Sequence, residues 1–271
     1  MNDGGRLAGR VALVTGAGSG LGLAVAERYV REGARVTIAE LDGERARAAA
    51  AGLGEAGIGV QCDVSKADDV ERAFDACLER FGRLDILVNN AAVTGAAVRH
   101  FLEIDEALWD LVVDANLKGH FLCAHRAARH MVEQGAGVII NFSSGGGSRA
   151  HRGMVAYDAA KGGVEAFTRA VALDLAPYGV RCVCIVPGLM ETSATGAEAE
   201  ERARATAATV PLGRQGTGAD IAGAAVFLAG DDATYVTGSS IYVDGGVLVQ
   251  QRSPEVETFP LDRFPRAGRL S

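Results

Sequence analysis

The chain of 271 residues contains no apolar run that approaches the ~20 residues needed to cross a bilayer. Residues 1–9 lack the cationic stretch and the apolar segment that together form a secretory signal. Basic side chains form no block, and the formal net charge is -7, which argues against binding of nucleic acid. These absences favour a cytoplasmic protein with neither a membrane nor a nucleic-acid partner.

Cysteine is scarce, with only five residues, an odd number in a chain too large to need disulfide staples. We therefore expect reduced thiols. Cys182 and Cys184 stand two apart in an apolar run, so on a strand both would point to one face. A metal pair is one interpretation, but small buried apolar side chains are the better one, and we expect no metal site.

Short β-branched runs alternate with longer helical stretches through most of the chain, which indicates βαβ units. Most of the runs are almost entirely apolar, as strands buried on both faces must be. The sequence predicts a single Rossmann-like, doubly wound α/β domain whose seven-stranded parallel sheet is flanked by helices. The expected strands are Val11–Thr15, Arg35–Ala39, Ile58–Cys62, Leu84–Val88, Gly137–Phe142, Val180–Val186 and Ser240–Val243.

The helical segments lie between these strands, near residues 20–32, 43–53, 66–80, 105–134, 157–177 and 218–229. Two regions break the alternation. Residues 191–217 carry no strand pattern and are interpreted as a flexible helical lid, whereas residues 247–271 are rich in Arg, Glu and Pro and are interpreted as an extended tail. No linker divides the chain, so residues 1–271 are expected to form one domain with a core of about residues 7–246.

The first strand ends in a glycine-rich turn, Thr15 to Gly22, and a helical pattern follows at once. Glycines at such a junction let the backbone approach a pyrophosphate, whose charge is met by amides at the helix N-terminus. The second strand leads to Glu40, where a carboxylate suits the ribose hydroxyls of NAD and opposes the 2′-phosphate of NADP. Ser19 and Leu41 supply no compensating base, so we expect NAD as the cofactor.

Tyr157 and Lys161 are one helical turn apart, so both side chains leave the same face of a helix. A phenol titrates near ~10, but an adjacent ammonium and a positive nicotinamide ring both favour the phenolate, which makes Tyr157 a usable general acid or base. Lys161 is one of only three lysines in the chain, and arginine could not replace it where a compact, transferable charge is needed.

Further candidates follow the fifth predicted strand, because ligands bind at the carboxyl ends of parallel strands. Ser144 and Ser143 come directly after it, and His151 lies in the glycine-rich segment before Tyr157, where it is expected to contact a substrate at the mouth of the pocket. Asn116 stands inside a predicted helix, where helix propensity gives no reason for it.

From about Leu7 to Gly246 the chain resembles the short-chain dehydrogenase/reductase family. The spacing Thr-Gly-x-x-x-Gly-x-Gly carries the resemblance, together with Asn89-Asn90-Ala91-Ala92, where Ala92 replaces the usual glycine, and with Val243 to Gly246. It implies a tetrad in which Ser144 binds the substrate oxygen and Asn116 anchors a water that relays protons to Lys161. It also implies that the cofactor contacts Gly16, Ser19, Gly20, Leu21, Glu40, Leu41, Asp63, Val64, Asn90, Ala91, Ala92, Tyr157, Lys161, Pro187, Gly188, Met190 and Thr192.

The expected activity is NAD-dependent interconversion of a secondary, including cyclic, alcohol and a ketone, with Tyr157 as the acid/base. A sensor of the same fold that binds NAD but has lost turnover is the alternative. Such a protein would show erosion at Tyr157, Lys161 or Ser144, and none is visible. The many small residues of the helices near 105–134 and 157–177, which pair between subunits in the resembled family, predict a homotetramer.

Overall fold

The computed structural model describes residues 5–191 and 196–251, and its central feature is a seven-stranded, fully parallel sheet. The strand order is β3-β2-β1-β4-β5-β6-β7. The strands are β1 Val11–Thr15, β2 Arg35–Glu40, β3 Gly57–Gln61, β4 Ile86–Asn89, β5 Gly137–Phe142, β6 Val180–Pro187 and β7 Ser240–Val243. The predicted doubly wound, seven-stranded fold is confirmed.

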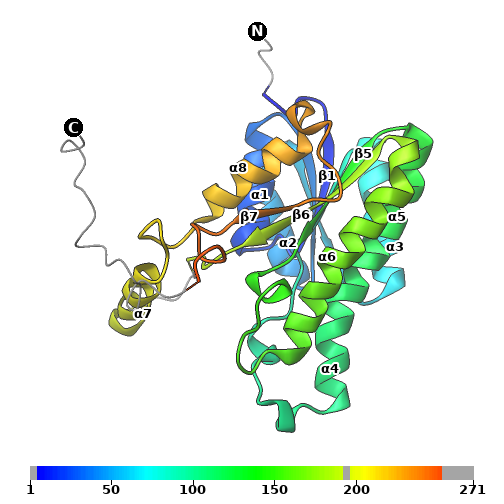
Figure 1. Cartoon of the computed structure of the whole chain (residues 1–271). Coiled ribbons are helices and arrows are strands. Elements are labelled where there is room, and N and C mark those ends of the chain that lie inside the picture. Colours follow the sequence, from blue (N-terminus) through cyan, green and yellow to red (C-terminus); the bar gives the residue numbers. More distant parts are fainter. Residues whose placement is uncertain (1–4, 192–195, 252–271) are drawn as a thin grey trace, which may run out of the picture.

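Helices cover both faces of the sheet (Figure 1). On one face the apolar cluster joins the sheet to α1 (Gly20–Arg31), α2 (Gly43–Gly52) and α8 (Gly218–Ala229). On the other face it joins the sheet to α3 (Ala67–Phe81), α5 (Gly119–Gln134) and α6 (Val155–Leu175). Burial on both sides explains why the inner strands read as continuous apolar runs.

The order of the strands reverses beside β1, which pairs with β2 on one side and with β4 on the other. Val14 of β1 is in register with Ile38 and Val88 of these neighbours. Chains that leave adjacent strands at this point diverge to opposite faces, which opens a crevice beyond the carboxyl ends of the strands. The sheet thus places the glycine-rich turn, Glu40 and the end of β4 around a common opening.

The predicted helix over residues 105–134 is interrupted. It consists of α4 (Glu106–Val113), a π-helical turn over Asp114–Lys118, and α5. Single π-helical turns occur inside α-helices and concentrate at functional sites. The helical segment expected near residues 105–134 is present, and Asn116, the residue whose counterpart kinks this helix in the resembled family, lies in the irregular turn.

The predicted lid contains α7 (Ala197–Ala208), which stands apart from the helices on the sheet (Figure 1). The described part of the predicted tail packs inward, with Leu248 against Val164, Cys184 and Val186. Arg149 donates a hydrogen bond to the carbonyl of Gln250, which anchors this segment beside the loop after β5. Across residues 5–191 and 196–251, none of the helices has the length and apolar character needed to cross a membrane.

Candidate active site

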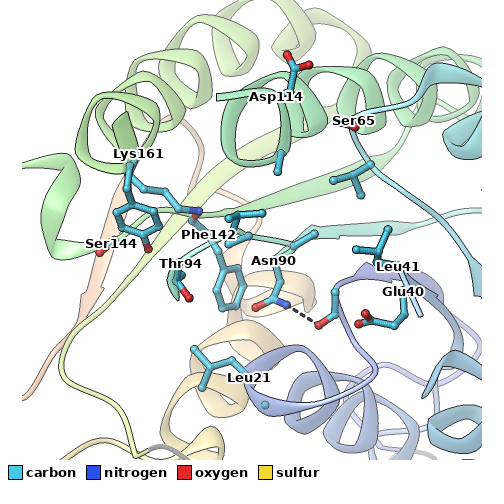
Figure 2. Close-up of a pocket in the computed structure, with 18 of the residues that line it drawn as sticks. Leu21, Glu40, Leu41, Ser65, Asn90, Thr94, Asp114, Phe142, Ser144 and Lys161 are labelled. Atoms are coloured by element: carbon cyan, nitrogen blue, oxygen red, sulfur yellow. Dashed lines mark hydrogen bonds between the residues drawn. The ribbon is translucent and has the colours of Figure 1, made fainter. Parts of the chain in front are cut away.

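A cavity of about 870 Å³ lies at the carboxyl ends of the strands. Figure 2 shows Ser144 and Lys161 at one end of this cavity and Glu40 and Leu41 at the other, with Asn90 between them. Its lining brings together the following predicted site residues: Gly16, Ser19, Gly20, Leu21, Glu40, Leu41, Asp63, Val64, Asn90, Ala91, Ala92, Ser144, Tyr157, Lys161, Pro187, Gly188 and Met190.

The turn after β1 requires glycine for two physical reasons. Gly16 has a φ of +61°, and a Cβ there would lie 2.7 Å from the Cα of Ala91, so both the backbone conformation and the close approach exclude a side chain. Asn90 secures the turn by donating from Nδ2 to the carbonyls of Thr15 and Gly16, at 3.0 Å each. Ser19 caps α1 without a side-chain hydrogen bond, so the turn leaves the first amides of that helix available to an anion.

Glu40 is buried at the opposite wall, where it is 8% exposed. Its Oε2 accepts a hydrogen bond from the amide of Gly18 at 3.1 Å, and its Oε1 lies 3.2 Å from Nη2 of Arg45. From the sequence we expected no basic residue near Glu40, because positions 19 and 41 are Ser and Leu. That expectation is wrong, since Arg45, in the first turn of α2, forms an ion pair with Glu40.

Asp63 and Val64 line the cavity beyond β3. The Asp63 carboxylate accepts hydrogen bonds from the amide and the hydroxyl of Ser65, at 3.0 and 2.7 Å. The amide of Asp63 donates to the carboxylate of Asp69 at 3.0 Å. These contacts hold the segment in one conformation at the rim of the cavity.

Lys161 is almost fully buried, with 1% exposure. Its Nζ donates to the carbonyl of Phe142 at 2.8 Å and lies 5.7 Å from the centroid of the Tyr157 ring. Burial disfavours the ammonium and lowers the pKa of Lys161 to about 8. The protonated and neutral forms are therefore both accessible close to neutral pH.

Tyr157 is held on the same face of α6, and burial raises the pKa of its phenol, while a hydrogen bond with Ser144 lowers it. We expected the ammonium of Lys161 to favour the phenolate, but among the protein's own groups burial has the larger effect. The reason is the low polarity of the surroundings, since Tyr157 packs with Ala97, Val112 and Ala156.

The two serines after β5 have different surroundings. Ser143 is 4% exposed, and its hydroxyl lies 2.9 Å from Oε1 of Glu165 and 3.1 Å from the carbonyl of Lys161. Ser144 is partly exposed, and its hydroxyl accepts a hydrogen bond from the amide of Gly146 while also bonding Tyr157. The geometry thus favours Ser144 over Ser143 as the serine that faces a ligand.

Asn116 is fully buried in the π-helical turn. Its Nδ2 donates to the carbonyls of Val93 and Val112, at 3.0 and 2.9 Å. Its Oδ1 has no hydrogen-bond partner within the part of the chain that the structure describes. Buried polar atoms that lack a protein partner are commonly hydrogen-bonded to an ordered water.

His151 stays outside the residues that line the cavity. Its Nδ1 lies 2.9 Å from Oδ1 of Asp158, and its amide donates to the same carboxylate at 2.6 Å. The pair fixes the loop before α6 against the first turn of that helix. Thr192, the expected partner of the nicotinamide amide, lies outside the described residues.

Sequence reasoning missed several residues that line the cavity, among them Thr94 and Arg45. Thr94 lines the cavity near Ser144 (Figure 2), but no motif marks its position in the loop after β4. Arg45 also lines it, and here a signal was available: the residue lies in the first turn of the helix that follows Glu40. All five cysteines are buried, as expected for Cys182 and Cys184, and burial raises the pKa of these two thiols to about 12.

Together, the doubly wound sheet, the glycine turn and the Tyr157–Lys161 pair define the class of α/β oxidoreductases with a Rossmann-like fold. Residues 16–248 match a family model described as enoyl-(acyl carrier protein) reductase. Over 245 residues the chain is 40% identical to 2-(R)-hydroxypropyl-CoM dehydrogenase of Xanthobacter autotrophicus, covering 87% of this chain and 97% of that protein.

A second relative is D-threitol dehydrogenase of Mycolicibacterium smegmatis, with 40% identity over 250 residues, 90% of this chain and 95% of that protein. Among solved structures, the 3-ketoacyl-(acyl-carrier-protein) reductase of Brucella melitensis, complexed with NADH, superposes with a TM-score of 0.82 at 36% identity. That match covers 89% of this chain and 99% of the other. The chain belongs to the short-chain dehydrogenase/reductase family, as the sequence motifs predicted.

Proposed function

We propose that this protein is an NAD-dependent dehydrogenase that interconverts a secondary or cyclic alcohol and a ketone without a metal. The observation that carries the proposal is the shared cavity, with Tyr157, Lys161 and Ser144 at one end and the glycine turn and Glu40 at the other. The NADH-bound relative and the two dehydrogenases among the similar proteins support it.

The cavity fits a dinucleotide. The glycine turn gives a pyrophosphate access to the backbone, and the open amides of α1 face the same opening. Glu40 stands where ribose hydroxyls would lie, and Asp63 and Val64 would flank the adenine. When bound, NAD supplies the hydride acceptor.

The chain's own groups would handle the proton and the substrate. Ser144 would donate a hydrogen bond to the substrate oxygen, and Tyr157 would take the hydroxyl proton during oxidation and return it during reduction. Lys161 would hold the nicotinamide ribose and favour the phenolate of Tyr157. The unpartnered Oδ1 of Asn116 would help to hold a water that connects Lys161 to solvent.

The wild-type protein tests this function and the cofactor preference together. Purified protein, mixed with a panel of secondary and cyclic alcohols, should generate reduced-nicotinamide absorbance with NAD. On any alcohol that reacts, kcat/KM should be at least tenfold lower with NADP. Two like charges about 4 Å apart repel by up to roughly 4 kcal/mol at an intermediate dielectric. Even half of that repulsion corresponds to more than a tenfold loss of affinity for NADP. Equal or better use of NADP would contradict the preference, and NAD binding without turnover would favour the sensor alternative.

We also propose that the protein is a homotetramer in the cytoplasm. Apolar side chains stand exposed on the helices expected to pair, with Phe121 of α5 at 47% and Leu173 of α6 at 78% exposure. Burial of such side chains in an interface would remove them from water. Light scattering should give about four times the chain mass of 28.0 kDa, and a monomer mass would refute the proposal.

A further inference from the structure

The segment that follows β7, residues 244–250, contacts two parts of the molecule that are distant in sequence: the loop after β5 and the C-terminal end of α7. Asp244 shapes this segment, because its carboxylate accepts hydrogen bonds from the amides of Gly246 and Leu248, at 2.9 and 2.8 Å. The family match ends at residue 248, so the contacts of Gln250 lie beyond it.

On one side the segment holds the turn that follows Ser144. This turn contains three glycines, Gly145–Gly147, whose backbone is conformationally permissive. The amide of Arg149 closes the turn by donating to the carbonyl of Gly145 at 2.8 Å. Nη1 of Arg149 donates to the main-chain carbonyl of Gln250 at 2.9 Å. The segment therefore holds a permissive turn in place next to Ser144.

On the other side the same residue binds the end of α7. Nε2 of Gln250 donates to the carbonyl of Thr209 at 2.9 Å, and Thr209 is the C-terminal cap of α7. This helix stands apart from those that cover the sheet (Figure 1). Gln250 thus binds α7 through its side chain and the turn after Ser144 through its main chain.

Leu248 gives Gln250 a defined position. Its side chain packs against Val164, Cys184 and Val186, which belong to α6 and β6. It also lies beside the turn, since a Cβ on Gly145 would be 3.4 Å from Cδ2 of Leu248. Because these apolar contacts already order the segment, the hydrogen bonds of Gln250 require little further loss of conformational freedom.

We propose that Gln250 is a positioning residue that joins the C-terminal end of α7 to the turn after Ser144, so that the placement of this serine depends on the placement of α7. The inference rests on the proposed role of Ser144 in binding the substrate oxygen. The contacts with Thr209 and Arg149 act in series, so the loss of either one breaks the connection.

Hydrogen exchange followed by mass spectrometry tests the connection without substrate or turnover. Gln250→Met removes the bond to Thr209 and keeps the main-chain carbonyl that Arg149 uses, whereas Arg149→Met removes the opposite bond. Each variant should speed exchange about threefold or more in both residues 145–149 and residues 206–210. The double variant should match the single variants, because either change alone already breaks the connection.

The decisive result is the distant effect, which a merely local role would not produce. Gln250→Met should loosen the turn after Ser144, and Arg149→Met should loosen the end of α7. Gln251→Met is the matched control, since Gln251 is an exposed neighbour of the same type that makes no hydrogen bond with any residue that the structure describes. The control should exchange like the wild type, and circular dichroism should show that every variant is folded.

Two outcomes would overturn the proposal: exchange that changes only on the side where the contact was removed, and effects that add in the double variant. On any alcohol that the wild type oxidises, kcat/KM should fall about threefold to tenfold in Gln250→Met and stay unchanged in Gln251→Met. An unchanged kcat/KM in Gln250→Met would refute the positioning of Ser144. A wild type that oxidises no alcohol but shows the distant effects would refute the proposed function and support the connection between α7 and the turn.

Discussion

Tyr157→Phe should remove at least nine-tenths of the turnover while the affinity for NAD stays within about threefold of the wild-type value. The substitution deletes only the hydroxyl, and the ring keeps its packing with Ala97, Val112 and Ala156. Steady-state kinetics would give the rate, and fluorescence titration the affinity. More than a tenth of the wild-type rate in the variant would contradict the acid/base role.

The pH profile adds a second readout for Tyr157. Burial raises the pKa of its phenol, so the base needed for alcohol oxidation becomes more abundant as the pH rises. The wild-type oxidation rate should therefore increase with pH, and the residual rate of Tyr157→Phe should lose this dependence. Ketone reduction needs the protonated phenol and should show the opposite slope.

Lys161→Ala should weaken NAD binding and lower the rate together, each by tenfold or more, because the proposed lysine contacts the ribose and also favours the phenolate. Binding is measured by titration and the rate by steady-state kinetics. Lys118→Ala is the matched control, since Lys118 is an exposed lysine outside the cavity lining that pairs with Asp114. A loss confined to the rate in Lys161→Ala would contradict the ribose contact.

The lowered pKa of Lys161 should also make the unfolding free energy of the protein depend on pH. Its folded pKa of about 8 lies below the ordinary pKa of a lysine, 10.5, so between these values the unfolded chain binds a proton that the folded protein does not. The unfolding free energy of the wild type, relative to Lys161→Met, should rise as the pH increases from about 8 toward 10.5. Chemical denaturation of both proteins across this range gives the difference.

The sequence predicted the sheet well where the strands are apolar and bounded by clear turns. Val11–Thr15, Gly137–Phe142 and Ser240–Val243 have the predicted bounds. The edge strand β3 begins one residue earlier than predicted, at Gly57, because a partly exposed run with two glycines has no sharp hydrophobic boundary. The only local signal of the π-helical turn was Asn116, a poor helix former inside a segment of otherwise helical composition.

The site residues could be predicted where a motif fixes the backbone geometry. They could not be predicted where the contact depends on the rotamer of a side chain. The glycine turn, Glu40, Ser144, Tyr157 and Lys161 line one cavity because the carboxyl ends of the strands converge there. The partners of Arg45 and His151 depend instead on rotamers at loop and helix junctions. Spacing placed Arg45 in the first turn after Glu40, but it could not show that the two side chains pair, nor that His151 pairs with Asp158.

The π-helical turn sets the rotational phase of the two helices that it joins. Each residue of an α-helix advances by about 100°, so a turn that accommodates one additional residue offsets every side chain that follows it. Before the turn, Val112 of α4 faces the ring of Tyr157; after it, Cys123 and Ala127 of α5 face the sheet. The turn therefore allows α4 to face Tyr157 and α5 to face the sheet, and Asn116 lies in the turn between the two helices.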